Sequence, residues 1–392
     1  MYNTFCVNFL KKLIFSFLII CIGILLGFIA SHFLIQKNIL QKNTNSQKQV
    51  IGFLPFSLLS RAGTDYSRYI TQLSYFSLTV NPDGTIRKLN SQTEEEPGWY
   101  ALSSGRVAPF LDSAKAKNIS LSLVAYSGDS NDIAGLIANP KVNAKTLSNE
   151  IIPIMKQNNF SNLNLDIEYT SNASSSSSQN FTKFVQEIKS NLKAQKAGTL
   201  TVDIAPSDFV KSNLVDPKAI GKIADSIVIM AYDYHSTASY VSGPVAPLYG
   251  AGIESEYDVN TAIQKAVSDI PSSKVILGAP LYGYEWETLN SAPRSAVIPG
   301  TGVAASNKRA EQTLNNCTNC SLHFDQTNQE AYFTYFDSNS NTFHQIFYPT
   351  FNSTQAKANI ANQYNLGGVA LWALGYEGST ILNPLSSYLK QN

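Results

Sequence analysis

The chain has 392 residues and a formal net charge of +1 at pH 7, and 15% of its residues are charged, against the ~25% usual for soluble domains. A near-neutral balance gives no electrostatic footprint for nucleic acid, and the length allows one large α/β domain with an insertion or two smaller domains. Asn, Ser, Gln and Thr supply the polarity instead. That composition suits neutral ligands such as sugars and a location outside the cytoplasm.

The amino-terminal region contains an apolar run at residues 13–35 without Asp, Glu, Lys or Arg. It is long enough for a membrane-spanning helix of ~20 residues, whereas a cleaved signal peptide usually has an apolar core of ~7–15 residues. We therefore expect an uncleaved anchor in the cell membrane, with secretion as the alternative if the segment is cleaved. Lys11 and Lys12 favour a cytoplasmic tail over residues 1–12. Residues 36–49 are polar and predict a tether that holds residues 50–392 outside the cytoplasm.

Beyond the tether, apolar strand-like segments alternate with helix-like segments. The expected strands are 50–55, 73–80, 119–126, 164–168, 200–205, 226–232, 275–282 and 368–374. The expected helices are 108–117, 144–157, 180–192, 217–224, 259–268 and 354–364. Eight strands that alternate with helices predict a parallel (β/α)8 TIM barrel. The serine run at 174–178 is expected to be a flexible loop at the rim of that barrel.

Residues 285–350 break this rhythm. Aromatic β-like runs at 331–336 and 343–348 flank a turn at 337–341, which predicts a small α+β insertion between the seventh and eighth strands. Cys317 and Cys320 form a lone CxxC motif within it. A structural zinc site needs a second ligand pair, so a local disulfide is favoured, and two unpaired cysteines are the alternative.

The fourth strand carries the strongest functional signal. Polar and apolar residues alternate over 161–168, which places Asn162, Asn164, Asp166 and Glu168 on one face. In a buried strand, two carboxylates and an amide on one face are costly unless they are paired or used. Because active sites of β/α barrels lie at the carboxyl ends of the strands, this pattern predicts a catalytic strand. A polar edge strand is the alternative.

Aromatic residues recur at the ends of three later strands. The candidate site residues there are Met230, Tyr232 and Asp233, then Tyr282 and Trp286, then Trp372. An aromatic ring with a polar tip offers a sugar apolar contact and a hydrogen bond together. Their recurrence favours a carbohydrate site over aromatic side chains that only fill a large barrel.

Together these motifs resemble glycoside hydrolase family 18, the chitinase-like barrels. The fourth-strand pattern DxxDxDxE of that family is matched at Ser161, Asn164, Asp166 and Glu168, and its Met-x-Tyr-Asp element at 230–233. Its seventh strand resembles residues 278–283, and its eighth-strand tryptophan matches Trp372. Asn at 164 resembles the branch of bacterial spore-cortex and peptidoglycan-processing members, often Asn-x-Asp-x-Glu. Ser161 and Asn164 depart from the general pattern.

The resemblance implies a retaining, substrate-assisted glycosidase acting on β-1,4-linked N-acetylglucosamine glycans, either chitin-like oligosaccharides or peptidoglycan. It implies that Glu168 is the general acid and base, that Asp166 orients the substrate acetamido group, and that Tyr232 steadies its oxygen. Asn164 is expected to hydrogen-bond Asp166 and to contribute to substrate binding, and Asp233 and Trp372 are expected to bind the sugar. No cofactor, metal ion or nucleic acid is expected, and the chain is expected to be a monomer. The alternatives are a non-catalytic chitinase-like lectin and an anchored structural protein.

Overall fold

The computed structural model describes residues 48–390 except 212 and 254. The expected cytoplasmic tail, the expected anchor at 13–35 and nearly all of the tether lie outside the described residues. Within the described ranges, no helix combines the length and apolar character needed to cross a membrane.

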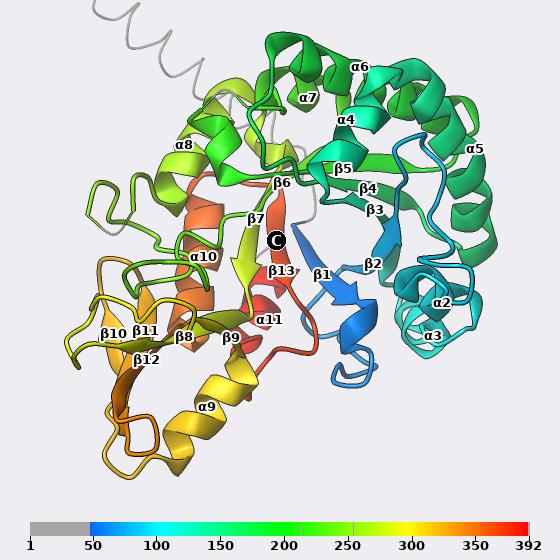
Figure 1. Cartoon of the computed structure of the whole chain (residues 1–392). Coiled ribbons are helices and arrows are strands. Elements are labelled where there is room, and N and C mark those ends of the chain that lie inside the picture. Colours follow the sequence, from blue (N-terminus) through cyan, green and yellow to red (C-terminus); the bar gives the residue numbers. More distant parts are fainter. Residues whose placement is uncertain (1–47, 212, 254, 391–392) are drawn as a thin grey trace, which may run out of the picture. The chain divides into compact units, whose positions relative to one another are not determined.

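Eight parallel strands close into a barrel in the order β1-β13-β7-β6-β5-β4-β3-β2 (Figure 1). Their bounds are β1 Gln49–Pro55, β2 Gln72–Thr79, β3 Ser120–Ser127, β4 Asn162–Ile167, β5 Thr199–Ile204, β6 Ser226–Ile229, β7 Val275–Pro280 and β13 Gly368–Trp372. Each overlaps one of the eight predicted strands, so the predicted parallel barrel is confirmed. Strands β1, β6, β7 and β13 are nearly continuous apolar runs because both of their faces are covered. In β3, β4 and β5, polar residues alternate with apolar ones.

Helices surround the barrel on the outside (Figure 1). Their bounds are α2 Pro97–Ser103, α3 Ala108–Ala116, α4 Ser130–Ala138, α5 Pro140–Asn158, α6 Ser175–Ala194, α7 Pro217–Ile223, α8 Val259–Asp269, α10 Phe351–Gln363 and α11 Asn383–Lys390. Short 3-10 helices are η1 Phe56–Leu58, η2 Pro206–Phe209 and η3 Ser272–Lys274. Helix α6 shows how they pack, because Phe181, Phe184, Val185, Ile188 and Leu192 recur at three- to four-residue spacing and are buried.

The serine run is not the loop that the sequence predicted. Ser174 is the N-cap of α6, and its hydroxyl accepts a hydrogen bond from the backbone N–H of Ser177 at 3.1 Å. The rest of the run forms the first turn of that helix. Serine is favoured at this position because its oxygen satisfies a backbone donor that the helix leaves free.

The barrel interior combines an apolar plug with a polar ladder. The plug consists of Ile51, Phe53, Val124, Val228, Ile276 and Ala370. In the ladder, the Ser122 hydroxyl donates to Asn162 Oδ1 at 2.8 Å, and Asn162 Nδ2 donates to Thr201 Oγ1 at 3.0 Å. Ser122, Asn162 and Thr201 therefore satisfy one another's hydrogen-bonding groups, as burial requires, whereas Asn164 Oδ1 and Asp166 Oδ1 have no partner among the described residues.

A second, antiparallel sheet follows β7, with strand order β10-β11-β12-β8-β9. Its elements are β8 Tyr282–Thr288, β9 Val303–Ser306, α9 Asn307–Asn316, β10 His323–Asp325, β11 Glu330–Asp337 and β12 Thr342–Tyr348. Cys317 and Cys320 form a disulfide just after α9. The predicted seventh strand at 275–282 is wrong at its end, because β7 stops at Pro280 and Tyr282 already belongs to the second sheet. Leu281 between them donates its N–H to the Trp372 carbonyl at 2.6 Å.

Candidate active site

The acidic strand β4 delivers its polar side chains to the carboxyl end of the barrel. Asn164 and Asp166 are 1% and 2% exposed, whereas Glu168, just beyond the strand, is exposed. The backbone N–H of Glu168 donates to the Ser127 carbonyl at 2.9 Å and so continues the pairing with β3 past the end of β4. Asp166 is therefore a buried carboxylate, and Glu168 is a carboxylate accessible from the open end.

Asp203 on β5 completes an acidic cluster that the sequence analysis missed. Asn164 Nδ2 donates to Asp203 Oδ1 at 2.9 Å, so the expected hydrogen bond between Asn164 and Asp166 is wrong. Neighbouring strands lie ~4.8 Å apart, whereas residues two apart on one strand are separated by ~6.6 Å, so the amide reaches across to β5. The Asn164 amide is engaged with Asp203, and the expected part of Asn164 in substrate binding stays a prediction. Alternation of Thr199, Thr201 and Asp203 in β5 was the signal that could have found Asp203.

Burial and mutual repulsion raise the pKa values of these carboxyl groups. Burial raises the pKa of Asp166 well above its usual value, and the charges of Asp203 and Glu168 add to this. Burial also raises the pKa of Asp203, against the lowering effect of the Asn164 hydrogen bond. Partial loss of contact with water raises the pKa of Glu168, and the charge of Asp233 raises it further. A carboxyl group that keeps its proton at a higher pH is suited to general-acid chemistry.

The segment after β6 brings Tyr232 and Asp233 to the same end of the barrel. Strand β6 ends at Ile229, and Asp233 has a left-handed φ of 60°. Its carboxylate accepts hydrogen bonds from the Tyr282 hydroxyl and, at 2.7 Å, from the Tyr284 hydroxyl. Burial first, and then the charge of Asp203, raise the pKa of Tyr232 well above its usual value. The phenol of Tyr232 therefore stays protonated and can donate a hydrogen bond.

A cavity of about 350 Å³ lies beside Glu168. Met230, Asp203 and Asp208 contribute to its wall. Burial raises the pKa of Asp208 to about 6. The predicted residues Met230 and Glu168 thus share one cavity wall with Asp203.

Aromatic rings cover the apolar plug at this end of the barrel. Trp372 is half-buried, and its ring lies edge-on to Phe76 at 4.7 Å between centroids and tilted to Phe53 at 5.8 Å. Tyr126 lies 5.2 Å from Phe76, and burial followed by the charges of Glu168 and Asp166 raises its pKa to about 12. The structure therefore adds Phe76 and Tyr126 to the predicted Trp372. Together the three rings form an apolar surface suited to a sugar ring.

Two predicted binding residues support the site instead of lining it. Trp286 is fully buried, and its Nε1–H donates to the Ser236 carbonyl at 3.0 Å, so its ring is not available to stack on a sugar. Tyr282 is 6% exposed, and its hydroxyl is held by Asp233. Both residues begin the second sheet and pack against the segment that follows β6.

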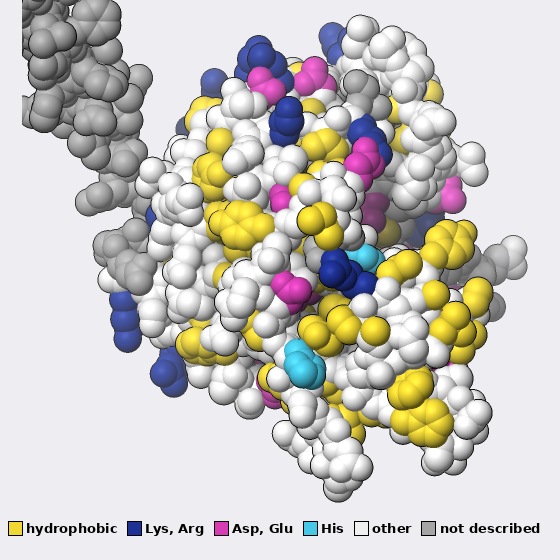
Figure 2. Space-filling view, turned by 90° about the vertical axis from the view of Figure 1, so that its left-hand side faces the viewer, with side chains coloured by type: hydrophobic (Ala, Val, Ile, Leu, Met, Phe, Trp, Pro, Cys, Tyr) yellow, Lys and Arg dark blue, Asp and Glu magenta, His cyan; other side chains and the backbone are white. Residues whose placement is uncertain are grey.

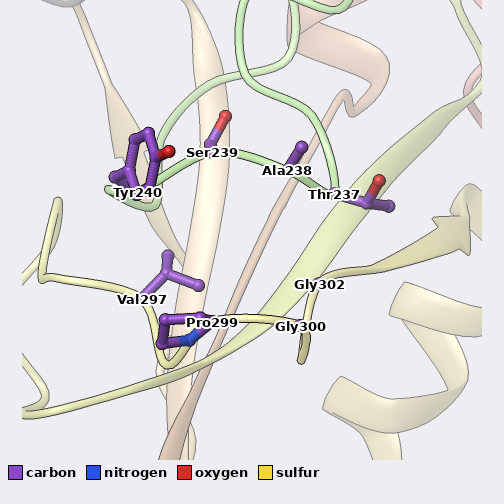
Figure 3. Close-up of a pocket in the computed structure, with 8 residues that line it drawn as sticks. All are labelled: Thr237, Ala238, Ser239, Tyr240, Val297, Pro299, Gly300 and Gly302. Carbon is purple, nitrogen blue, oxygen red and sulfur yellow. The ribbon is translucent and has the colours of Figure 1, made fainter.

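A second cavity, of about 420 Å³, contains none of the predicted site residues. Figure 3 shows that it lies between the segment 237–240 and the segment 297–302, with the Tyr240 and Val297 side chains at one end. Its lining carries no charged side chain. On the face that Figure 2 shows, hydrophobic side chains lie in several separate groups, with Lys, Arg, Asp and Glu side chains scattered between them. No His, Cys, Asp or Glu group of the described ranges is arranged to hold a metal ion.

Comparisons with known proteins agree with this architecture. The family model for "Glycosyl hydrolases family 18" matches residues 10–377. The cortical fragment-lytic enzyme of Bacillus subtilis is 24% identical over 333 residues, which cover 81% of this chain and 67% of that protein. The chain therefore spans about two thirds of the length of that curated relative.

Solved structures of similar fold include two kinds of enzyme. The spore cortex-lytic enzyme SleL of Bacillus megaterium superposes with a TM-score of 0.69 at 23% identity, covering 87% of this chain and 74% of that one. The Group IV chitinase of Ostrinia furnacalis, in complex with allosamidin, gives a TM-score of 0.74 at 20% identity, covering 88% and 99%. At these identities the structural likeness supports the fold.

Proposed function

The chain belongs to the glycosyl hydrolases of family 18 and is a glycosidase, and from this premise we propose that it cleaves β-1,4-linked N-acetylglucosamine glycans at the carboxyl end of its barrel. The observation that carries the proposal is the pairing of an exposed Glu168 of raised pKa with a buried Asp166 behind it. Glu168 is accessible and holds its proton to a higher pH than an ordinary glutamate, and Asp166 is shielded from water. Such a separation of roles is what acid catalysis beside a fixed orienting group requires.

The proposed reaction is substrate-assisted and needs no enzyme nucleophile. Glu168 donates its proton to the glycosidic oxygen as the bond from that oxygen to the anomeric carbon breaks. The acetamido oxygen of the substrate forms the new bond to that carbon, while Asp166 accepts a hydrogen bond from the acetamido N–H. Tyr232 donates a hydrogen bond to the acetamido oxygen. Water then attacks the anomeric carbon, Glu168 takes its proton, and configuration is retained.

The remaining site residues bind the sugar in this proposal. Trp372, edge-on to Phe76 at 4.7 Å, offers an apolar surface beneath the ring. Asp233, fixed by the hydroxyls of Tyr282 and Tyr284, accepts hydrogen bonds from sugar hydroxyls. An aromatic floor with a few fixed polar groups is the usual composition of a small-molecule site.

Wall peptidoglycan is the substrate that we favour over diffusing chitin. The sequence motif Asn-x-Asp-x-Glu and the cortical fragment-lytic relative support this choice. We also propose that residues 13–35 anchor the chain in the cell membrane with the barrel outside. This placement would keep the enzyme within reach of the envelope.

The test is hydrolysis by the full-length chain, purified in mild detergent, of N-acetylglucosamine oligomers and purified peptidoglycan. Glu168→Gln is expected to lower turnover by ~10²–10⁴-fold, because the general acid is lost, and to spare binding. Glu187→Gln, on the outer helix α6, is the matched control and is expected to keep full turnover. Wild-type turnover in Glu168→Gln would remove the mechanism, and tight binding without cleavage by the wild type would indicate a lectin.

Anchoring is tested separately on membranes of cells that express the chain. The proposal expects the full-length protein to stay in the membrane fraction after alkaline carbonate washing. Release of the barrel into the medium would show that the segment is cleaved and the protein secreted.

A further inference from the structure

Asp203 is a buried carboxylate to which the mechanism above gives no task. It is 5% exposed and points into the barrel from β5, where its partner is the Asn164 amide at 2.9 Å. In the described part of the chain, no cation is among the groups that shift the pKa of Asp203, Asp166, Glu168 or Asp233. A buried carboxylate without a cation is destabilising, so its presence next to the proposed site calls for a function.

The groups that face Asp203 belong to the proposed reaction. From β4 and its end come Asn164, Asp166 and Glu168, and from the segment after β6 comes Tyr232, with Asp233 beyond it. Asn164 pairs with Thr201 in the β4–β5 ladder, and Leu165 pairs with Val202. The next pair in this register is Asp166 with Asp203, so the two carboxyl-bearing residues are cross-strand neighbours.

We infer that Asp203 is a positioning residue that, from strand β5, supplies the carboxylate that the family pattern has at position 164, and that its negative charge holds a proton on Asp166. The inference rests on the proposed function and deepens it. Position 164 carries an amide here, which cannot titrate. The amide donates to Asp203 across the strands and so links the relocated carboxylate to the acidic strand.

The location of the charge follows from the hydrogen bonding. Asn164 Nδ2 donates to Asp203 Oδ1, and an N–H donor stabilises the ionised form of a carboxyl group. Asp166 Oδ1 is buried and has no hydrogen-bond partner among the described residues. Two neighbouring buried carboxyl groups do not both ionise. The charge therefore rests on Asp203 and the proton on Asp166 until substrate binds.

The experiment compares the full-length wild type with Asp203→Asn and with the exchanged variant Asn164→Asp/Asp203→Asn. Removing the negative charge at position 203 favours the ionised form of Asp166, so the pKa of Asp166 falls. We expect the acidic limb of the kcat/KM profile on N-acetylglucosamine oligomers to move to lower pH by about one unit in Asp203→Asn. The exchanged variant returns a carboxylate to the pair and is expected to move the limb back toward the wild-type pH.

The control is Asp225→Asn. Asp225 precedes β6 at the opposite end of the barrel and bonds the Leu200 N–H at 2.7 Å, so the variant tests the loss of a carboxylate away from the site. Its pH profile is expected to match the wild type. As a readout independent of turnover, the pKa of Asp166 is followed by ¹³C NMR of the Asp carboxyl carbons in labelled protein, with Asp166→Asn used to assign the signal.

The outcomes separate the two proposals. A wild type that binds no glycan and cleaves none overturns the proposed function, while the NMR titration still tests Asp203. An unchanged Asp166 pKa in Asp203→Asn overturns the inference, as does lost turnover with an unshifted profile that the exchange does not restore. If Asp203→Asn does not fold, Asn164→Asp alone is measured. It adds a negative charge and should shift the limb to higher pH, and an unshifted limb there is equally contrary.

Discussion

The buried ion pair between Glu330 on β11 and Lys357 on α10 offers a sharp test of how the second sheet is fastened to the barrel. Lys357 Nζ lies 3.7 Å from Glu330 Oε1, and the side chains are 1% and 0% exposed. Glu330 also accepts the backbone N–H groups of Val245 and Ala246, both at 2.8 Å. Lys357→Met removes the cation and nearly preserves the volume, so it isolates the charge.

The expected cost of Lys357→Met is about 3 kcal/mol in the free energy of unfolding at pH 8. Removing one partner of a buried pair usually costs ~3–5 kcal/mol, and the low end applies because Glu330 keeps two backbone donors. Burial raises the pKa of Glu330, and Lys357 opposes this, so the variant raises that pKa further. The folded state then binds more protons than the unfolded state, and the unfolding free energy falls as pH rises. The cost should therefore be smaller at pH 5 than at pH 8.

The assay is urea unfolding followed by the fluorescence of Trp99, Trp286 and Trp372, at both pH values. Lys211→Met is the control, because Lys211 and Glu256 form a shorter pair, 2.6 Å, on the exposed surface, and exposed pairs contribute little. Glu330→Gln/Lys357→Met should recover part of the loss, since no unpaired charge remains. A Lys357→Met cost that matches the control, or that is equal at pH 5 and pH 8, would refute the reasoning.

Two further outcomes follow from the carboxyl groups of the site. Asp233→Asn removes a charge that raises the pKa of Glu168, so that pKa falls and the alkaline limb of the kcat/KM profile should move to lower pH; a limb that stays in place contradicts the coupling. Asp166→Asn should lower turnover at least ~10²-fold, yet raise the melting temperature at pH 8 more than at pH 5. Because the pKa of Asp166 is raised on folding, the folded state binds the extra proton and loses stability as the pH rises through that pKa, and the substitution removes this loss; calorimetry that shows no gain at pH 8 would count against this.

The barrel could be predicted because short strands, apolar throughout or apolar at every second residue, follow one another between helices. The boundary after Pro280 could not, because the apolar residues continue unbroken from β7 into β8 while the chain passes from one sheet to the other. Composition does not show which sheet a strand joins.

The acidic strand was predicted from alternation, which assigns residues to a face but not to a neighbour. The resemblance led us to expect Asn164 to pair with Asp166 along its own strand, whereas the structure pairs it with Asp203 across the ladder. The prediction that Trp286 binds the sugar did not foresee its burial, for a related reason. It follows barrel strand β7 in the sequence, and at the end of a barrel strand an aromatic ring would be open to a ligand. In the structure Trp286 belongs to the second sheet and is buried there.

The hydrogen bonds from Tyr282 and Tyr284 to Asp233 affect how the second sheet could be exchanged between family members. Both tyrosines belong to β8, the first strand of the second sheet, yet they orient a carboxylate of the barrel. A chimera in which the whole second sheet is replaced would also lose the two hydroxyl groups that donate to Asp233 in the barrel. A replacement that begins after Tyr284 would leave both donors to Asp233 in the host, although Trp286 would still have to fit the host's Ser236 carbonyl.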